Sequence, residues 1–162
     1  MKRRLKADSL SQFFHISPTR QFRWLVTGVK FKYKKIASGL VRPIIPIDLS
    51  YKHFSPISYE ALADSGADIC VFPSQIGELM GINIKSGSVG QLQGVIGKTG
   101  KIYYHDICID IGGYQYIVNA AFSYSAKLQY GFLGHRGIFN KFIIQFQTRK
   151  EVVEFRQETN IN

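Results

Sequence analysis

The chain is poor in cysteine: Cys70 and Cys108 are the two among its 162 residues. They form no C-x-x-C pair, and the four histidines are not clustered, which argues against a metal site. Both cysteines fall in apolar, strand-like stretches. We interpret them as buried free thiols of a protein from a reducing compartment, and we expect no metal and no other cofactor.

Long hydrophobic runs are also missing. No stretch approaches the roughly 18 apolar residues that a membrane span needs, so we expect no membrane span. The start, MKRRLKADSLSQFFHI, is basic but has no apolar core, and it is a poor secretory signal. An organellar transit peptide stays open because this start is rich in arginine and poor in acids. We expect a cytoplasmic protein.

Acidic residues are scarce, with 11 against 21 basic ones and a net charge of +10. The imbalance is local: residues 1–35 hold ten basic residues and one acid, whereas residues 36–162 hold eleven basic residues and ten acids. The charge therefore belongs to the N-terminal arm. We interpret residues 1–28 as a basic, disordered tail, and a pro-segment is an alternative. Contact of this tail with nucleic acid or an acidic membrane surface is another.

The rest of the chain has the composition of one folded domain, with 45% hydrophobic and 14% aromatic residues. Its apolar residues form short runs, several of them alternating with polar ones, which is typical of β-strands. Strands are expected at 29–34, 57–63, 69–72, 88–111 (a long hairpin), 114–122, 142–146 and 152–155. The prolines of RPIIPIDL indicate an edge or bulged strand. Helices are expected at 73–81 and near 136–141. The fold is therefore mainly β, a barrel or a sandwich.

One motif stands out at the end of an apolar strand: Ala63-Asp64-Ser65-Gly66-Ala67, within the stretch LADSGADICVFP. Seventy residues after Asp64 comes a second signal, Phe132-Leu133-Gly134. An isolated Asp-Ser-Gly is typical of an ordinary turn. The ordered set is more specific: apolar strand, Asp-Ser-Gly-Ala-Asp, apolar strand, helix, glycine-rich hairpin, then apolar-apolar-Gly.

That order, over roughly residues 29–156, resembles the retroviral-type (retropepsin-like) single-domain aspartic proteases. The likeness is greatest to their uncharacterised prokaryotic branch, in which RPIIPI, a DSGAD turn followed by FP, and an LGHRG-type second loop occur together. The resemblance implies a closed β-barrel with one or two short helices, active as a two-fold homodimer. Residues 29–156 would form the protease domain, with 157–162 as a C-terminal tail.

The resemblance also implies roles for individual residues. Asp64 matches the catalytic aspartate, Ser65 the hydroxyl residue that locks two active-site loops across the dimer, and Gly66 the turn glycine. The hairpin tip at 94–100 matches the flap that closes over substrate. The substrate-binding residues would be Ala67, Asp68, Val95, Ile96 and Gly97. Many relatives carry an arginine directly after the second-loop glycine. Here His135 takes that place and Arg136 follows, which leaves open whether either pairs with Asp68.

The function implied is that of an aspartic endopeptidase acting on peptide or protein substrates. Two Asp64 carboxylates, one from each subunit, would share a proton and activate a water molecule. Val152–Phe155 is the candidate for part of the dimer interface. Two alternatives stay open. One is a catalytically silent dimerisation or peptide-binding module with a nucleic-acid-binding arm. The other is an unrelated, monomeric β-barrel in which Asp64 is a turn acid.

Overall fold

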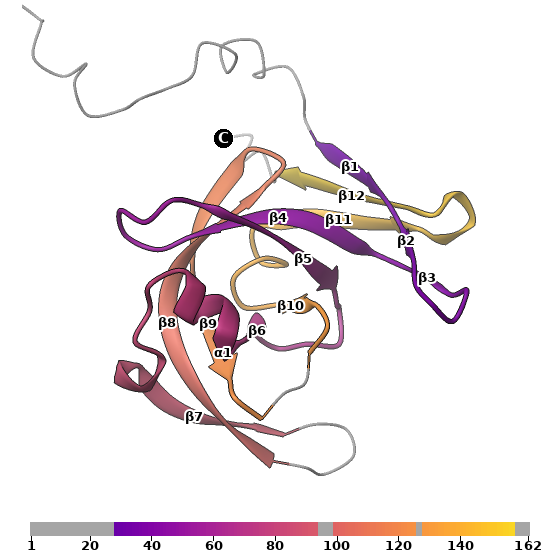
Figure 1. The fold of residues 1–162 in the computed structure, drawn as a ribbon. Helices are drawn as coiled ribbons and strands as arrows, with labels where there is room; N and C mark the ends of the chain where they lie inside the picture. Colours follow the sequence, from indigo (N-terminus) through magenta and orange to yellow (C-terminus); the bar gives the residue numbers. More distant parts are fainter. Residues whose placement is uncertain (1–27, 94–98, 126–127, 158–162) are drawn as a thin grey trace, which may run out of the picture.

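A computed structural model describes residues 28–93, 99–125 and 128–157 (Figure 1). Three expectations lie outside these residues: the basic tail before Gly28, the flap tip with Val95, Ile96 and Gly97, and the C-terminal tail after Gln157. No helix in the described part of the chain is long and apolar enough to cross a membrane.

The described residues are mainly β-strands. The strands are β1 (Val29–Lys32), β2 (Lys34–Lys35), β3 (Val41–Arg42), β4 (Ile44–Ser50), β5 (Ile57–Ala63), β6 (Val71–Pro73), β7 (Ser88–Gln93), β8 (Thr99–Ile111), β9 (Tyr114–Ser123), β10 (Gly131–Leu133), β11 (Phe142–Gln147) and β12 (Val152–Gln157). The α-helix is α1 (Ser74–Leu79), and the 3-10 helices are η3 (Ile84–Ser86) and η4 (Thr148–Lys150).

Six strands close into a barrel. Their order is β4-β5-β10-β6-β9-β8, and pairing between β4 and β8 completes the ring. β5 and β10 run parallel, as do β6 and β9, and the remaining neighbours are antiparallel. A separate three-stranded sheet has the order β1-β12-β11, and β2 pairs with β3. The expected fold class, a closed and mainly β barrel, is confirmed.

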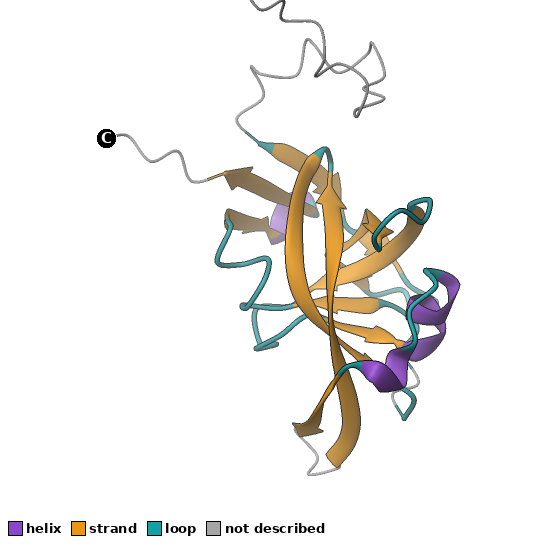
Figure 2. Ribbon diagram, turned by 90° about the vertical axis from the view of Figure 1, so that its left-hand side faces the viewer, coloured by secondary structure: helices purple, strands orange, loops and turns teal. Residues whose placement is uncertain are grey.

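The long strand β8 continues beyond the barrel, where it pairs with β7 (Figure 2). Along one edge of β8, Cys108–Asp110 pair with β4, whereas Thr99–Tyr104 pair with β7 outside the ring. A tight turn joins β8 to β9, because Ile111 pairs with Tyr114 and the two residues between them are Gly112 (φ +59°) and Gly113 (φ +99°). Glycine adopts such angles without steric cost.

The barrel interior is filled by alternating apolar side chains. On β4, Ile45, Ile47 and Leu49 point inward, and on β8 the corresponding residues are Ile107, Ile109 and Ile111. This alternation is what a strand with one buried face requires. Phe72 and Phe122 are fully buried, with ring centroids 6.0 Å apart. The three-stranded sheet adds Val153 and Phe155 to the same core.

The proline-containing segment is an edge strand over half of its length. Ile44–Ile47 pair with β5, and pairing with β8 begins only at Asp48. Pro46 therefore lies where β4 has one neighbouring strand, so its missing N–H costs no ladder hydrogen bond on a second side.

One expectation is wrong. No helix forms over residues 136–141: Arg136 makes an isolated bridge with Ile69, and residues 137–141 form turns. The physical reason is Gly137, whose φ of +118° no α-helix accommodates. That β12 forms part of a dimer interface stays a prediction, although neither edge of this strand is open to a partner chain. It lies between β1 and β11 of its own chain, and Val153 and Phe155 are buried. The helix expected at 73–81 is present as α1.

Candidate active site

The two sequence motifs meet because β5 and β10 are parallel neighbours. Ala63 pairs with Leu133, and each strand ends there. The next residues, Asp64 and Gly134, therefore leave the sheet side by side. The backbone N–H of Asp64 donates a hydrogen bond to the Leu133 carbonyl oxygen at 3.1 Å. This places the acid at the edge of the barrel, as the sequence predicted.

A tight turn then holds the Asp64 carboxylate. The N–H of Ala67 donates to the Asp64 carbonyl oxygen at 3.2 Å, and the N–H of Gly66 donates to Asp64 Oδ1 at 2.9 Å. Asp64 is half-buried, whereas Ser65 and Gly66 are exposed. A backbone donor of this kind fixes the orientation of the carboxylate.

The second loop crosses the first at close range. The N–H of His135 donates to the Ala67 carbonyl oxygen at 2.9 Å, and that of Arg136 to the Asp68 carbonyl oxygen at 2.8 Å. A Cβ on Gly134 would lie 2.4 Å from the Ile69 carbonyl oxygen. Glycine is required at this crossing because no side chain fits between the two backbones.

The buried Cys70 side chain also joins the first loop to the second. Its Sγ accepts the Gly134 N–H at 3.5 Å and donates to the Arg136 carbonyl oxygen at 3.8 Å. Burial raises the pKa of the Cys70 thiol to about 11, although the hydrogen bond from Gly134 opposes the shift. The thiol is therefore protonated at neutral pH, which makes Cys70 a packing group and no nucleophile. Both cysteines are free, and Cys108 is half-buried.

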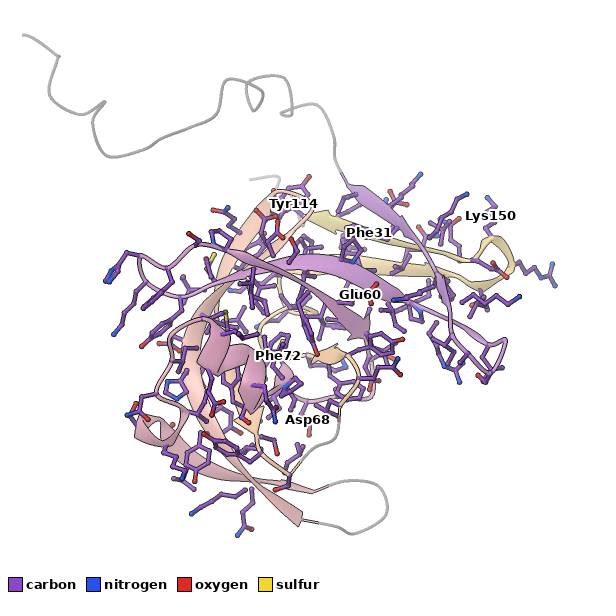
Figure 3. The ribbon with its side chains drawn as sticks, in the orientation of Figure 1. Phe31, Glu60, Asp68, Phe72, Tyr114 and Lys150 are labelled. Atoms are coloured by element: carbon purple, nitrogen blue, oxygen red, sulfur yellow. The ribbon has the colours of Figure 1, made fainter. Side chains whose placement is uncertain are left out.

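Asp68 and His135 do not form the side-chain pair that the sequence left open. Within the described residues the Asp68 carboxylate has no ion pair or hydrogen bond, and Asp68 is exposed. In Figure 3, Asp68 lies below Phe72 in the lower half of the view, whereas Tyr114 lies at the top. His135 binds the first loop differently: its Nε2 lies 2.8 Å from the Ser65 carbonyl oxygen.

An apolar cluster links the site to the β7–β8 hairpin. Its buried centre is Val71, Ile102 and Ala121. Half-buried residues of three segments pack around this centre. They are Ile69 of the first loop, Leu128 and Phe132 in and before β10, and Leu92 and Tyr104 of the β7–β8 hairpin. The sequence pattern missed this cluster as a site feature, apart from Phe132 of the second motif. Its members come from segments far apart in the chain, and the spacing of apolar residues along the sequence does not show which segments come into contact.

Two surface hollows lie elsewhere. One of about 290 Å³ is bordered by Phe31, Asp48, Asp110 and their neighbours, and one of about 430 Å³ lies on β7 and β8 around Gly90 and Lys101. Neither is lined by Asp64. In the part of the chain that the structure describes, no group of three or more histidine, cysteine or acidic side chains could hold a metal ion.

The structure thus brings Asp64, Ser65, Gly66, Ala67 and Asp68 together with the second loop at 132–136.

No family model matches the sequence, and no curated protein does. Among solved structures, a retropepsin-like aspartic protease from Rickettsia conorii is similar, with a TM-score of 0.57 and 11% identity over 80% of this chain and 92% of that chain. The EIAV protease in complex with the inhibitor HBY-793 gives a TM-score of 0.44 and 18% identity, over 58% of this chain and 82% of that chain.

At 11% identity, the likeness to the Rickettsia conorii protein is one of fold. The barrel of six strands and the crossing of its two loops agree with it. The chain has the retropepsin-like aspartic protease fold that its sequence indicated.

Proposed function

We propose that this protein is an aspartic endopeptidase and that its active form is a two-fold homodimer. The observation that carries the proposal is the Asp64 turn. It places one carboxylate at the end of β5, gives it a backbone donor from Gly66 at 2.9 Å, and braces it against the second loop. An ordinary surface turn does not need a second loop crossing it at van der Waals distance.

The chemistry needs two carboxylates, and the chain has one Asp-Ser-Gly. Two Asp64 side chains about 3 Å apart cannot both ionise cheaply, so they share one proton and titrate as a pair. The ionised member takes a proton from a water molecule, which attacks the peptide carbonyl carbon. The protonated member donates its proton to the carbonyl oxygen. Collapse of the tetrahedral intermediate, with proton transfer to the nitrogen, releases the amine.

The exposure of the turn supports a second copy at this place. Asp64 is half-buried, and Ser65 and Gly66 are exposed on the single chain. A two-fold axis beside the turn would bury these residues and bring their symmetry mates into contact, as an isologous interface does. The Ser65 hydroxyl is the group that we expect to hydrogen-bond across that axis.

The proposed substrate is an extended peptide lying between the site and the β7–β8 hairpin. Ala67 and Asp68 follow the catalytic turn and would meet substrate main chain, while the hairpin tip with Val95, Ile96 and Gly97 would close over it. The apolar cluster around Phe132 supports a preference for bulky apolar or aromatic residues beside the cleaved bond. Residues 29–156 are the proposed protease domain.

Cleavage of a diverse peptide mixture tests this function, with cut sites read by mass spectrometry over a range of pH. Asp64→Asn should lower the rate on the order of 10⁴-fold or more, because it removes the shared-proton pair. Asp106→Asn is the matched control: this acid is exposed on β8 and binds the Asn119 amide at 2.7 Å, away from the turn. Its cleavage pattern should equal that of the unchanged protein.

Absence of cleavage would contradict the proposed function. No cleavage at any pH by a folded dimer would reject the protease and favour the silent binding module. Salt-sensitive nucleic-acid binding that disappears on deletion of residues 1–28 would then be the next test of that module.

A further inference from the structure

The peptide unit between Ser65 and Gly66 is held at both ends. Its N–H, on Gly66, donates to Asp64 Oδ1 at 2.9 Å, and its carbonyl oxygen, on Ser65, lies 2.8 Å from Nε2 of His135. One peptide group thus joins an imidazole of the second loop to the carboxylate of the first. Asp64, Ala67 and Asp68 make backbone hydrogen bonds to the second loop on either side of this peptide.

The hydrogen bond fixes the state of the histidine. A carbonyl oxygen only accepts, so Nε2 of His135 carries the proton and donates it. The ring is supported from behind by Phe139, with ring centroids 5.2 Å apart, and Phe139 stacks on Phe146 of β11. The imidazole therefore has a fixed direction toward Ser65, although the residue is exposed.

We propose that His135 is a positioning residue for Asp64, acting through the Ser65–Gly66 peptide. Donation to the Ser65 oxygen orients this peptide and polarises it, which strengthens the hydrogen bond that its N–H gives to the Asp64 carboxylate. The inference rests on the proposed function, in which Asp64 is the catalytic carboxylate.

Two substitutions separate the hydrogen bond from the bulk of the ring. His135→Gln keeps a donor, because the glutamine amide nitrogen reaches nearly the position of Nε2, and His135→Leu keeps apolar volume without a donor. His105 supplies the control. Its Nε2 lies 2.9 Å from the Ile84 carbonyl oxygen, a similar bond outside the site, so His105→Leu should leave the Asp64 turn unchanged.

The first readout does not depend on catalysis. The chain has 15 glycines, so selective ¹⁵N-glycine labelling gives a spectrum in which Gly66 can be assigned. In His135→Leu the Gly66 amide should exchange with solvent about threefold to tenfold faster, as expected for the loss of one net hydrogen bond. His135→Gln should keep the exchange rate of the unchanged protein, and so should His105→Leu.

The second readout is kinetic. His135→Leu should lower kcat by about threefold to tenfold with KM unchanged, and His135→Gln should restore kcat, because the interaction acts on the reacting carboxylate and not on substrate binding. Equal Gly66 exchange in the Leu and Gln variants would overturn the proposal, as would a Gln variant with the kcat of the Leu variant. If the unchanged protein cleaves nothing, the proposed function fails, while the Gly66 measurement still decides whether His135 orients the turn.

Discussion

Gly134 passes so close to Ile69 that a Cβ on the glycine would lie 2.4 Å from the Ile69 carbonyl oxygen and 2.7 Å from that of Ala67. Both obstacles are backbone atoms, which have little freedom to move. The loop that carries Asp64 and the loop that follows β10 are therefore packed backbone to backbone. Their relative position depends on the absence of a single side chain.

Gly134→Ala should consequently destabilise the protein by about 1–3 kcal/mol, as overpacking of a rigid site does. Urea denaturation measures the change. Gly100→Ala is the matched control, because a Cβ there would make an ordinary contact with Ser125 at 3.7 Å. A Gly134→Ala protein as stable as this control would show that the two loops are not tightly packed.

Cys70 gives the protein a pH dependence at the alkaline end. Its buried thiol has a pKa raised from about 9 to about 11, so the folded state keeps a proton that the unfolded state releases. The stabilisation is complete below pH 9 and is lost as the pH rises toward 11. Over this range the unchanged protein should lose about 2 kcal/mol more unfolding free energy than Cys70→Ala does.

Denaturation curves of both proteins at several pH values between 8 and 11 test this. The alanine variant has a constant loss of packing, which shifts its curve without changing the slope. Parallel pH profiles of the two proteins would mean that the thiol does not titrate differently in the folded state.

Asp68 should affect substrate binding more than the chemical step. Its carboxylate is exposed and has no partner in the described residues, while its backbone braces Arg136. Asp68→Asn keeps the backbone contacts and the side-chain shape. We expect KM to rise about tenfold with kcat nearly unchanged, because a charged hydrogen bond to substrate main chain is lost. A fall in kcat alone would place Asp68 in the reaction itself.

Much of the fold was predictable because local patterns determine it. The strand at Ile57–Ala63 follows from its apolar pattern, the helix from the proline that opens it, and the Gly112–Gly113 turn from turn chemistry. The expected helix near 136–141 failed because its pattern gave no warning that Gly137 would adopt a positive φ. At Gly137 a Cβ would lie 2.4 Å from the Val118 side chain, which is a contact with a strand far away in the sequence.

In the candidate site, too, the local features were predictable and the long-range contacts were not. The Asp64 turn was predictable from its own residues, and its partner loop from the apolar-apolar-Gly pattern. The contacts between them were not, because the parallel pairing of Ala63 with Leu133 joins residues far apart in the chain. The bond from His135 to Ser65 depends on that pairing, and so does the enclosure of Cys70 between the loops.

In the proposed enzyme, each active site needs one Asp64 from each of two chains. Mixing the unchanged protein with increasing amounts of Asp64→Asn, under conditions in which subunits exchange, tests it most directly through peptide cleavage. If two chains share the site, a ninefold excess of the variant should lower the activity of a fixed amount of unchanged protein about tenfold, because mixed dimers lack the pair. Activity that is unaffected by the excess would show that one chain suffices and that Asp64 is not shared between two chains.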